Sequence, residues 1–348
     1  VLEPSCGTGN FFGMLPDSMK ESRLFGVELD DVSGRIAQQL YPEARITISG
    51  YEKTKFPNNF FDIVVGNVPF GDYKVADRAY DKYNFMIHDY FIAKGLDQLR
   101  PGGIMAVITS SGTMDKINSH ARTYFAERAH LLGAIRLPDN AFKANAGTTV
   151  TTDVLFFQKN NGTPEPNPLW LHSKKNIPDD APLMVGDIVS YTSVYWDKTQ
   201  RKIISEESEC TILSKKTDPH NEMVFCKIKG ITEEADIETV LESNLRLIQR
   251  GEPTYTCNQY FQEHPEMVLG KLTVESGPFG EKLTCRDIED GNSLQEKFSH
   301  AAANIKGQIL PAYVEKRETE EKTEETIAAD PSIKNYSYAV INDEIYFR

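Results

Sequence analysis

The tetrapeptide Asn67-Val68-Pro69-Phe70 presents groups that could hold an aromatic amine for reaction. It ends the apolar run 61–67, which predicts a buried strand, so Asn67 is expected at the carboxyl edge of a sheet. An aromatic amine is a poor nucleophile because its lone pair is delocalised into the ring. Two acceptors, the Asn67 amide oxygen and the Val68 backbone carbonyl, would draw the nitrogen toward tetrahedral geometry and stabilise its developing positive charge. Phe70 could stack on the ring and Pro69 could stiffen the loop, although a plain turn would use the same residues.

The segment "EPSCGTGNF" (3–11) is a second candidate site, because Gly7 and Gly9 follow a predicted strand. Glycines there let the backbone turn sharply and approach a ligand closely. Phe12 occupies the place of the third glycine in the dinucleotide-binding pattern, so a ligand without a pyrophosphate fits better. At the end of the next predicted strand, Glu28 could accept both ribose hydroxyls of a nucleoside. A tight turn and a solvated loop acid are the alternative interpretation of these residues.

Short apolar runs alternate with amphipathic stretches across residues 1–160, which predicts an α/β domain with a mostly parallel sheet. A helix is expected at 84–99, and "RPGG" ends it. No helix is readable between the predicted strands 131–138 and 151–159, so these two should pair antiparallel at one edge. The other predicted strands are 23–29, 44–50, 61–67 and 104–110.

Weaker signals divide the rest of the chain. The divisions are a proline-rich linker at 161–169, an α+β accessory region of unknown role at 170–312, a charged linker at 313–330 and a β hairpin at 331–348. We expect the hairpin to begin a further domain. Apolar residues at helical spacing predict two helices in the accessory region, over 235–249 and 293–310.

The chain of 348 residues carries a net charge of −13, which argues mildly against nucleic-acid binding. Much of the acid lies late, at 315–325, so local basic loops could still contact a phosphate backbone. The five cysteines have no CxxC spacing, which predicts free thiols in a reducing cytoplasm and no metal site. No apolar run is long enough for a transmembrane helix, so no membrane association is expected.

Taken together and in this order, "EPSCGTGNF", "GVELD" and "NVPF" resemble the motifs of DNA amino-methyltransferases that use S-adenosylmethionine. The resemblance covers about residues 1–160. It implies the class I methyltransferase fold, a Rossmann-like seven-stranded sheet with an antiparallel final hairpin. It also implies an adenine-specific enzyme that methylates the exocyclic amine of adenine in DNA, with S-adenosyl-L-methionine as cofactor.

The resemblance carries roles to individual positions. Glu3, Pro4, Cys6, Gly7 and Gly9 would line the methionine part of the cofactor, Glu28 would hold its ribose, and Glu52 would lie at its adenine. Asn67 and Val68 would hold the target amine, with Phe70 stacking on one face of the base and Phe142 on the other. The family usually has proline where this chain has Val68. Valine still supplies a backbone carbonyl but lacks the fixed φ of proline.

An enzyme acting on a base amine must take the base out of the stack. The polar loops 71–84 and 110–122 are therefore candidate DNA contacts, although ordinary solvated loops would look the same. The expected phosphate contacts are Lys74, Arg78, Lys82, Lys116 and Arg122, with Tyr73, Tyr80 and Tyr83 as stacking candidates.

The run 66–116 resembles a subgroup, the very large methylase-helicase proteins of phages and conjugative elements. This resemblance implies a longer parent chain that continues into a helicase domain. Two other functions stay open. The chain could methylate a protein glutamine amide, because that family shares a related tetrapeptide, or it could be a non-catalytic DNA-binding or anti-restriction module that kept the fold.

Overall fold

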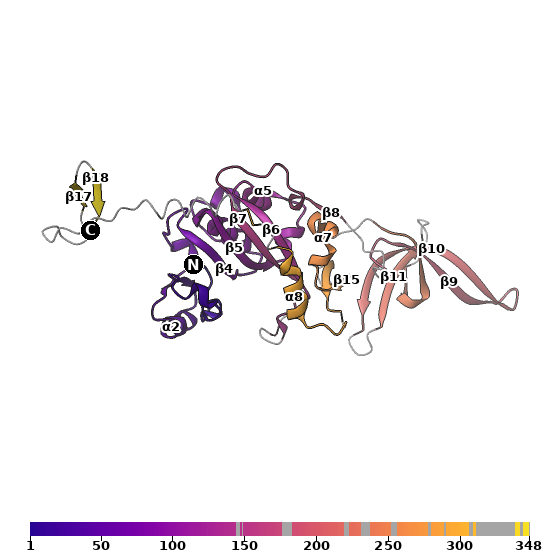
Figure 1. The fold of residues 1–348 in the computed structure, drawn as a ribbon. Coiled ribbons are helices and arrows are strands. Elements are labelled where there is room, and N and C mark those ends of the chain that lie inside the picture. The colour runs from indigo at the N-terminus through magenta and orange to yellow at the C-terminus, as the bar shows by residue number, and fades with distance from the viewer. Residues whose placement is uncertain are drawn as a thin grey trace. The chain divides into compact units, whose positions relative to one another are not determined.

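The computed structural model describes residues 1–143, 147, 149–175, 183–218, 223–230, 237–251, 256–277, 280–288, 290–305, 309–310, 338–341 and 344–347. The chain divides into two compact units, Val1–Ile309 and Leu310–Arg348. Each unit is described by itself (Figure 1).

A seven-stranded sheet forms the centre of the first unit, in the order β3-β2-β1-β4-β5-β7-β6. Its strands are β1 (Leu2–Glu3), β2 (Phe25–Glu28), β3 (Arg45–Ile48), β4 (Phe61–Asn67), β5 (Leu99–Ser110), β6 (Ala129–Leu137) and β7 (Thr152–Lys159). All neighbours are parallel except that β7 runs antiparallel to both β5 and β6. This arrangement confirms the predicted α/β class, the mostly parallel sheet and the antiparallel final pair, and it is the class I methyltransferase fold.

Helices connect the strands of this sheet. They are α1 (Asn10–Gly13), α2 (Asp31–Leu40), α3 (Ile87–Gln98), α4 (Gly112–Asp115) and α5 (His120–Ala126), with short 3-10 turns η1 (Asp17–Met19), η2 (Tyr51–Lys53) and η3 (Asp81–Tyr83). The side chain of Asp30 caps α2 by accepting from the N–H of Ser33 at 2.8 Å. The predicted helix 84–99 is confirmed as α3, which is buried on nearly every face. Gly95 permits its close approach, since a Cβ there would lie 2.7 Å from the Met105 side chain of β5.

A second sheet, of five strands, is formed by the part of the chain that lies between two short strands, which pair with each other. Strand β8 (Ser173–Lys175), which follows η4 (Leu169–Leu171), pairs antiparallel with β14 (Thr256–Asn258). Between them the chain forms β9 (Ile188–Asp197), β10 (Lys202–Thr217), β11 (Val224–Gly230), β12 (Ile237–Leu241) and β13 (Leu245–Gln249), in the order β12-β11-β10-β9-β13. This sheet has its own apolar cluster, which includes Val189, Ile212 and Ile228.

The helix predicted over 235–249 is wrong. The chain instead forms β12 and β13, joined by the 3-10 turn η5 (Glu242–Asn244). Ile237, Val240 and Leu245 do have helical spacing, but pairing of β12 with β11 and of β13 with β9 satisfies the backbone of this segment. Tertiary pairing therefore overrides a local periodicity that was the only signal in the sequence.

The last part of the first unit packs against the edge of the seven-stranded sheet. It comprises α7 (Gln259–Glu263), η6 (Pro265–Met267), β15 (Lys271–Gly277), β16 (Gly280–Arg286) and α8 (Leu294–Ala303). Helix α8 confirms the helix predicted over 293–310 and begins with a capping box between Ser293 and Glu296. Its Ala301 shares an apolar cluster with Ile135 of β6, so α8 helps cover the edge strand (Figure 1).

In the second unit, β17 (Tyr338–Ile341) and β18 (Glu344–Phe347) pair antiparallel, which confirms the predicted β hairpin. The predicted charged linker at 313–330 lies outside the described residues. Within the described residues, no helix is both long and apolar enough to cross a membrane.

Candidate active site

The glycine loop between β1 and α1 takes the strained turn that its sequence suggested. Gly7 and Gly9 have φ of +53° and +87°, a region that favours glycine. A Cβ on Gly9 would clash with the ring of Tyr41, whereas the space beside Gly7 is open. The Glu28 carboxylate accepts hydrogen bonds from the N–H of Gly7 at 2.7 Å and of Asp30 at 2.8 Å. The loop and the acid at the end of β2, separate signals in the sequence, therefore form one constellation.

Glu3 lies at the base of this loop and is only 2 % exposed. Its Oε2 atom has no hydrogen-bond partner among the described residues. Burial, and then the nearby charge of Glu28, raise the pKa of Glu3 to about 8. Burial, and then the charges of Glu3 and Glu28, also raise the pKa of the Cys6 thiol to about 12, which favours its protonated form.

The NVPF loop leaves β4 directly beside the glycine loop. The Ser5 hydroxyl donates a hydrogen bond of 2.8 Å to the backbone carbonyl of Asn67, and the Val68 N–H donates one of 3.1 Å to the carbonyl of Ile108. Val68 is buried, while Asn67 is exposed. Within the part of the chain that the structure describes, nothing bonds to the Asn67 amide or to the Val68 carbonyl. Both predicted acceptors are thus uncommitted.

The two aromatic residues that were predicted to stack on the base lie in different apolar clusters. Phe70 packs against the main apolar cluster of the sheet, whereas Phe142 packs against the cluster of β6 and α8. No described contact joins these two rings. The Glu52 carboxylate folds back over Gly50 at the end of β3. Pro4 lies in the glycine loop and Pro69 in the NVPF loop. Pro4 also packs close to Gly66, since a Cβ on Gly66 would lie 3.6 Å from the Pro4 ring.

Three of the five predicted phosphate contacts are exposed on the loop after the NVPF segment: Lys74, Arg78 and Lys82. Lys74 donates to the side chain of Asn84 at 2.6 Å, and the Lys82 ammonium lies 4.7 Å from the centre of the Tyr83 ring. Lys116 is also exposed. Of the three tyrosines, only Tyr73 is exposed, because Tyr80 bonds to Asp97 and Tyr83 stacks on Phe85.

Arg122 does not fit its predicted role, and that prediction is wrong. Its side chain is 1 % exposed, and its guanidinium donates to the backbone carbonyls of Thr113, Lys116 and Leu171. Burial lowers the pKa of Arg122 to about 10. The cation ties three backbone carbonyls together, and its burial keeps it from a phosphate outside the fold. Its place in a polar stretch of sequence gave no sign of this burial.

Two groups near this loop carried no signal in the sequence. His88 and Asp89, in the first turn of α3, are both buried, and the Lys116 ammonium lies 3.3 Å from His88 Nε2 and 3.8 Å from an Asp89 oxygen. Burial lowers the pKa of His88 to about 4 and raises that of Asp89 to about 6. Ser5 was also missed, because a single serine beside glycines does not reveal a partner in another strand.

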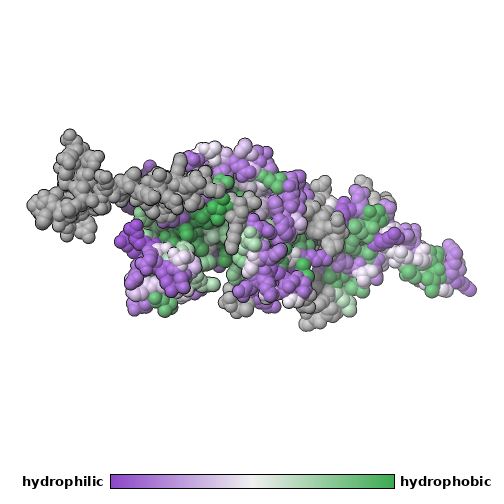
Figure 2. All heavy atoms as spheres, in the orientation of Figure 1, coloured by the Kyte–Doolittle hydropathy of each residue, from purple (hydrophilic) through white to green (hydrophobic). Residues whose placement is uncertain are grey.

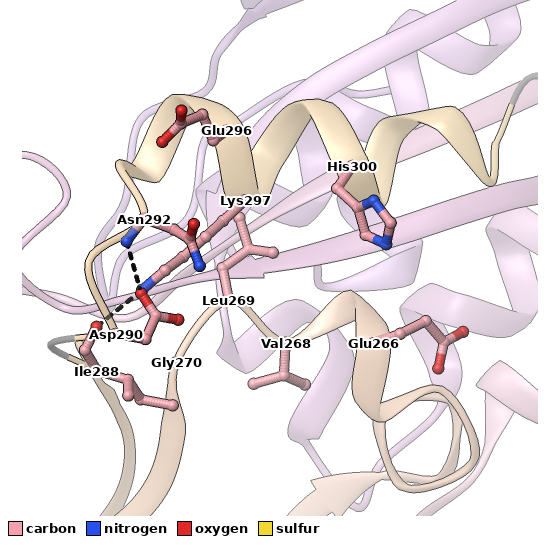
Figure 3. Close-up of a pocket in the computed structure, with 10 residues that line it drawn as sticks. All are labelled: Glu266, Val268, Leu269, Gly270, Ile288, Asp290, Asn292, Glu296, Lys297 and His300. Carbon is pink, nitrogen blue, oxygen red and sulfur yellow. Dashed lines mark hydrogen bonds and ion pairs between the residues drawn. The ribbon is translucent and has the colours of Figure 1, made fainter.

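A cavity of about 490 Å³ lies between η6, the start of β15 and α8 (Figure 3). Figure 3 shows Lys297 at its wall, in an ion pair of 3.1 Å with Asp290. None of the residues of the glycine loop, Glu28 or the NVPF loop lines this cavity. It is therefore separate from the candidate active site.

Comparison with known proteins places the chain in a family. The N-6 DNA Methylase family matches residues 1–228, which is more than half of the chain. The chain is 39 % identical over 165 residues to "Defense against restriction protein B" of Escherichia phage P1, covering 46 % of this chain and 7 % of that protein. It is 28 % identical over 115 residues to "Modification methylase CviBIII" of Paramecium bursaria Chlorella virus NC1A, covering 32 % of this chain and 30 % of that protein.

Among solved structures, the fold is similar to a modification subunit of a putative type I restriction enzyme from Vibrio vulnificus YJ016. The two share 18 % identity with a TM-score of 0.39, over 58 % of this chain and 44 % of that one. The chain spans less than a third of the length of either viral relative. On the extent of the family match, this chain belongs to the N-6 DNA methylase family.

Proposed function

We propose that this chain transfers a methyl group from S-adenosylmethionine to the exocyclic amine of adenine in DNA, with the target base flipped out of the duplex. The observation that carries the proposal is the pair of uncommitted acceptors, the Asn67 amide and the Val68 carbonyl, directly beside the glycine loop. Family membership supports the same substrate and reaction.

The residues of the glycine loop fit the proposed cofactor. The buried Glu3 Oε2 lacks a partner among the described residues, and a cationic ligand would satisfy it. Open space beside Gly7 lets a ligand approach the backbone. Glu28 uses one lone pair of each oxygen for the loop and keeps others for hydroxyl groups. When bound there, S-adenosylmethionine would supply an electrophilic methyl group.

The NVPF loop would hold the nucleophile. The Asn67 amide oxygen and the Val68 carbonyl oxygen would each accept one N–H of the adenine amine, which localises the lone pair on nitrogen. As the amine nitrogen takes up the methyl group and the sulfur leaves, the positive charge on nitrogen would lie between these two oxygens. The proton becomes acidic only after transfer and can leave to water, so no side chain of matched pKa is needed as a base. Phe70 would stack on the base, and Phe142 would close on its other face if DNA binding brings the two together.

DNA contacts are proposed at Lys74, Arg78, Lys82 and Lys116, which are exposed on the loops that follow β4 and β5. Each would neutralise a phosphate and orient the strand without reading its sequence.

Transfer of a labelled methyl group from S-adenosylmethionine tests the proposal. The full chain is incubated with DNA, and the label is counted separately in the DNA and in the protein. Asn67→Ala should lower transfer to DNA by about 100-fold or more, because one preorganised acceptor is lost. Asn58→Ala, at an exposed asparagine before β4, is the matched control and should leave transfer unchanged. Cofactor affinity should not differ between the two variants.

Each other result selects a different conclusion. Equal transfer by Asn67→Ala would remove Asn67 from the mechanism. Label found in protein and absent from DNA would favour methylation of a glutamine amide. Cofactor binding without any transfer would favour a non-catalytic module.

A further inference from the structure

Part of the second sheet extends as a ribbon of only two strands. β9 and β10 pair continuously from Ile188↔Thr211 to Asp197↔Lys202. β13 covers β9 only as far as Tyr191, and β11 covers β10 only from Cys210 onward. Residues 192–197 and 202–207 therefore pair only with each other among the described strands. Figure 1 shows this ribbon reaching beyond the rest of its sheet.

One face of the ribbon tip is apolar and exposed. Val194, Trp196 and Ile203 are 65 %, 57 % and 68 % exposed. Val194 and Trp196 alternate along β9, and Ile203 pairs directly with Trp196, so all three side chains share a face. Figure 2 shows hydrophobic surface just short of the hydrophilic end of the ribbon. A contiguous apolar patch on a two-stranded ribbon gains nothing for folding and is typical of a contact surface.

The turn of the same ribbon is basic. Lys198, Arg201 and Lys202 are exposed, and no described residue forms an ion pair with them. One acid, Asp197, lies at the tip, where it pairs across the ribbon with Lys202, so the tip carries three cations against one acid. Glu206 and Glu207 lie farther from the turn on β10. A chain with a net charge of −13 repels DNA as a whole, so contact with DNA requires cations concentrated at particular places. The tip of this ribbon is such a place, and it adds an aromatic side chain.

We propose that the tip of the β9–β10 ribbon binds duplex DNA, with Lys198, Arg201 and Lys202 on phosphates and Trp196, flanked by Val194 and Ile203, against the groove. The inference rests on the proposed function for its choice of partner. A two-stranded ribbon fits a DNA groove, and apolar side chains make contacts with sugars and base edges there. Cations beside an exposed aromatic ring favour a nucleic acid over an uncharged protein surface.

Tryptophan fluorescence gives a direct test, because the chain has two tryptophans in opposite environments. Trp170 is buried and Trp196 is exposed. In the Trp170→Phe variant, Trp196 is the remaining reporter, and added duplex DNA should quench it and protect it from acrylamide. The matched variant Trp196→Phe should show no change on addition of the same DNA. Unaltered Trp196 emission at DNA concentrations that saturate binding would overturn the proposal.

Charge removal gives an independent test. The triple variant Lys198→Gln, Arg201→Gln, Lys202→Gln should bind duplex DNA about 10-fold or more weakly. Its log-log salt slope should be shallower by about 2.7, because three phosphate contacts release about 0.9 counterion each. The control triple Lys216→Gln, Lys227→Gln, Arg246→Gln removes the same charge from exposed positions elsewhere in this sheet and should keep the original slope. Equal slopes in both triples would overturn the proposal.

These measurements need no methyl transfer, so they separate the two proposals. If the unmodified chain transfers no methyl group but the fluorescence and salt results hold, the ribbon contact stands and the enzymatic proposal falls. If transfer occurs and both triples bind alike, the ribbon proposal alone falls. Quenching of Trp196 that depends on protein concentration without DNA would assign the patch to self-association instead.

Discussion

The hydroxyl of Ser5 donates a 2.8 Å hydrogen bond to the backbone carbonyl of Asn67, which joins the glycine loop to the NVPF loop. Ser5 lies in the loop that follows β1, and Asn67 ends β4; these two strands are parallel neighbours. A carbonyl held from behind fixes the peptide plane that leads into Val68. Ser5 therefore couples the proposed cofactor side of the site to the side that would hold the amine.

Replacing Ser5 by alanine should slow methyl transfer while leaving cofactor affinity nearly unchanged. We expect a single-turnover rate about 5-fold lower, because a hydrogen bond of about 1 kcal/mol orients the two acceptors. Ser18→Ala, at an exposed serine of η1, provides the control. A Ser5→Ala rate equal to that of the control would show that the loops keep their geometry without this bond.

Val68 replaces the proline that is usual in this tetrapeptide, and its N–H bonds to the carbonyl of Ile108 on β5. Proline cannot make that bond, so Val68→Pro should destabilise the chain in spite of its rigid φ. We expect the free energy of unfolding, measured in urea, to be about 1 kcal/mol lower for Val68→Pro than for Val68→Ala. The alanine variant loses similar packing but keeps the N–H. A more stable proline variant would mean that the bond to Ile108 contributes nothing.

The pKa of Glu3, raised by burial to about 8, makes stability depend on pH. Between about pH 4.5 and about pH 8 the folded chain holds a proton on Glu3 that the unfolded chain releases, so stability falls as pH rises through this window. Glu3→Gln removes this loss. Its free energy of unfolding should be higher than that of the unmodified chain by up to roughly 5 kcal/mol above the window, with little difference below it.

Urea unfolding across this pH range measures the difference. Glu21→Gln, at an exposed acid, is the control and should track the unmodified chain at every pH. A Glu3→Gln curve parallel to the control would show that Glu3 ionises without penalty in the folded state.

Arg136 on β6 should be among the residues that are costliest to replace. It is 1 % exposed, forms two hydrogen bonds of 2.8 and 2.9 Å with the buried Asp153, and pairs with Asp115 at 2.9 Å. Its guanidinium also lies 4.1 Å from the centre of the Phe261 ring. Arg136→Met leaves Asp153 buried without its counter-charge, and we expect a loss of roughly 3–5 kcal/mol in unfolding free energy.

Arg100→Met is the comparison for this prediction, because Arg100 pairs with the partly exposed Asp62. An exposed pair of this kind is worth at most about 1 kcal/mol. If both variants lost equal stability in thermal or urea unfolding, the burial of Arg136 would not govern its contribution.

The parallel sheet and the glycine loop could be predicted because their signals are local. Buried parallel strands are short apolar runs, and carboxyl ends of neighbouring strands meet at one edge, which is why Gly7 and Glu28 come together. The lack of a readable helix between β6 and β7 was also enough to predict their antiparallel pairing.

What could not be predicted depends on partners distant in sequence. The sequence predicted that Arg122 is a solvent-exposed cation. In the structure it is buried and donates to the carbonyl of Leu171, which belongs to a distant segment of the chain. The apolar spacing of 237–245 fits a helix equally well, and only the presence of β11 and β9 as neighbours decides for strands. Ser5 became visible as a positioning residue only when β1 and β4 were placed side by side.

The pairing of β8 with β14 has a consequence for how such chains can diversify. Lys175 at the end of β8 pairs with Thr256 at the start of β14, so residues 176–255 leave and rejoin the fold at this pair of strands. An inserted segment whose two ends are held together by paired strands can be lengthened, shortened or exchanged while those strands keep their register. If the β9–β10 tip contacts DNA, the preference of the enzyme for its sites could change by replacing this cassette, with the methyl-transfer chemistry left intact.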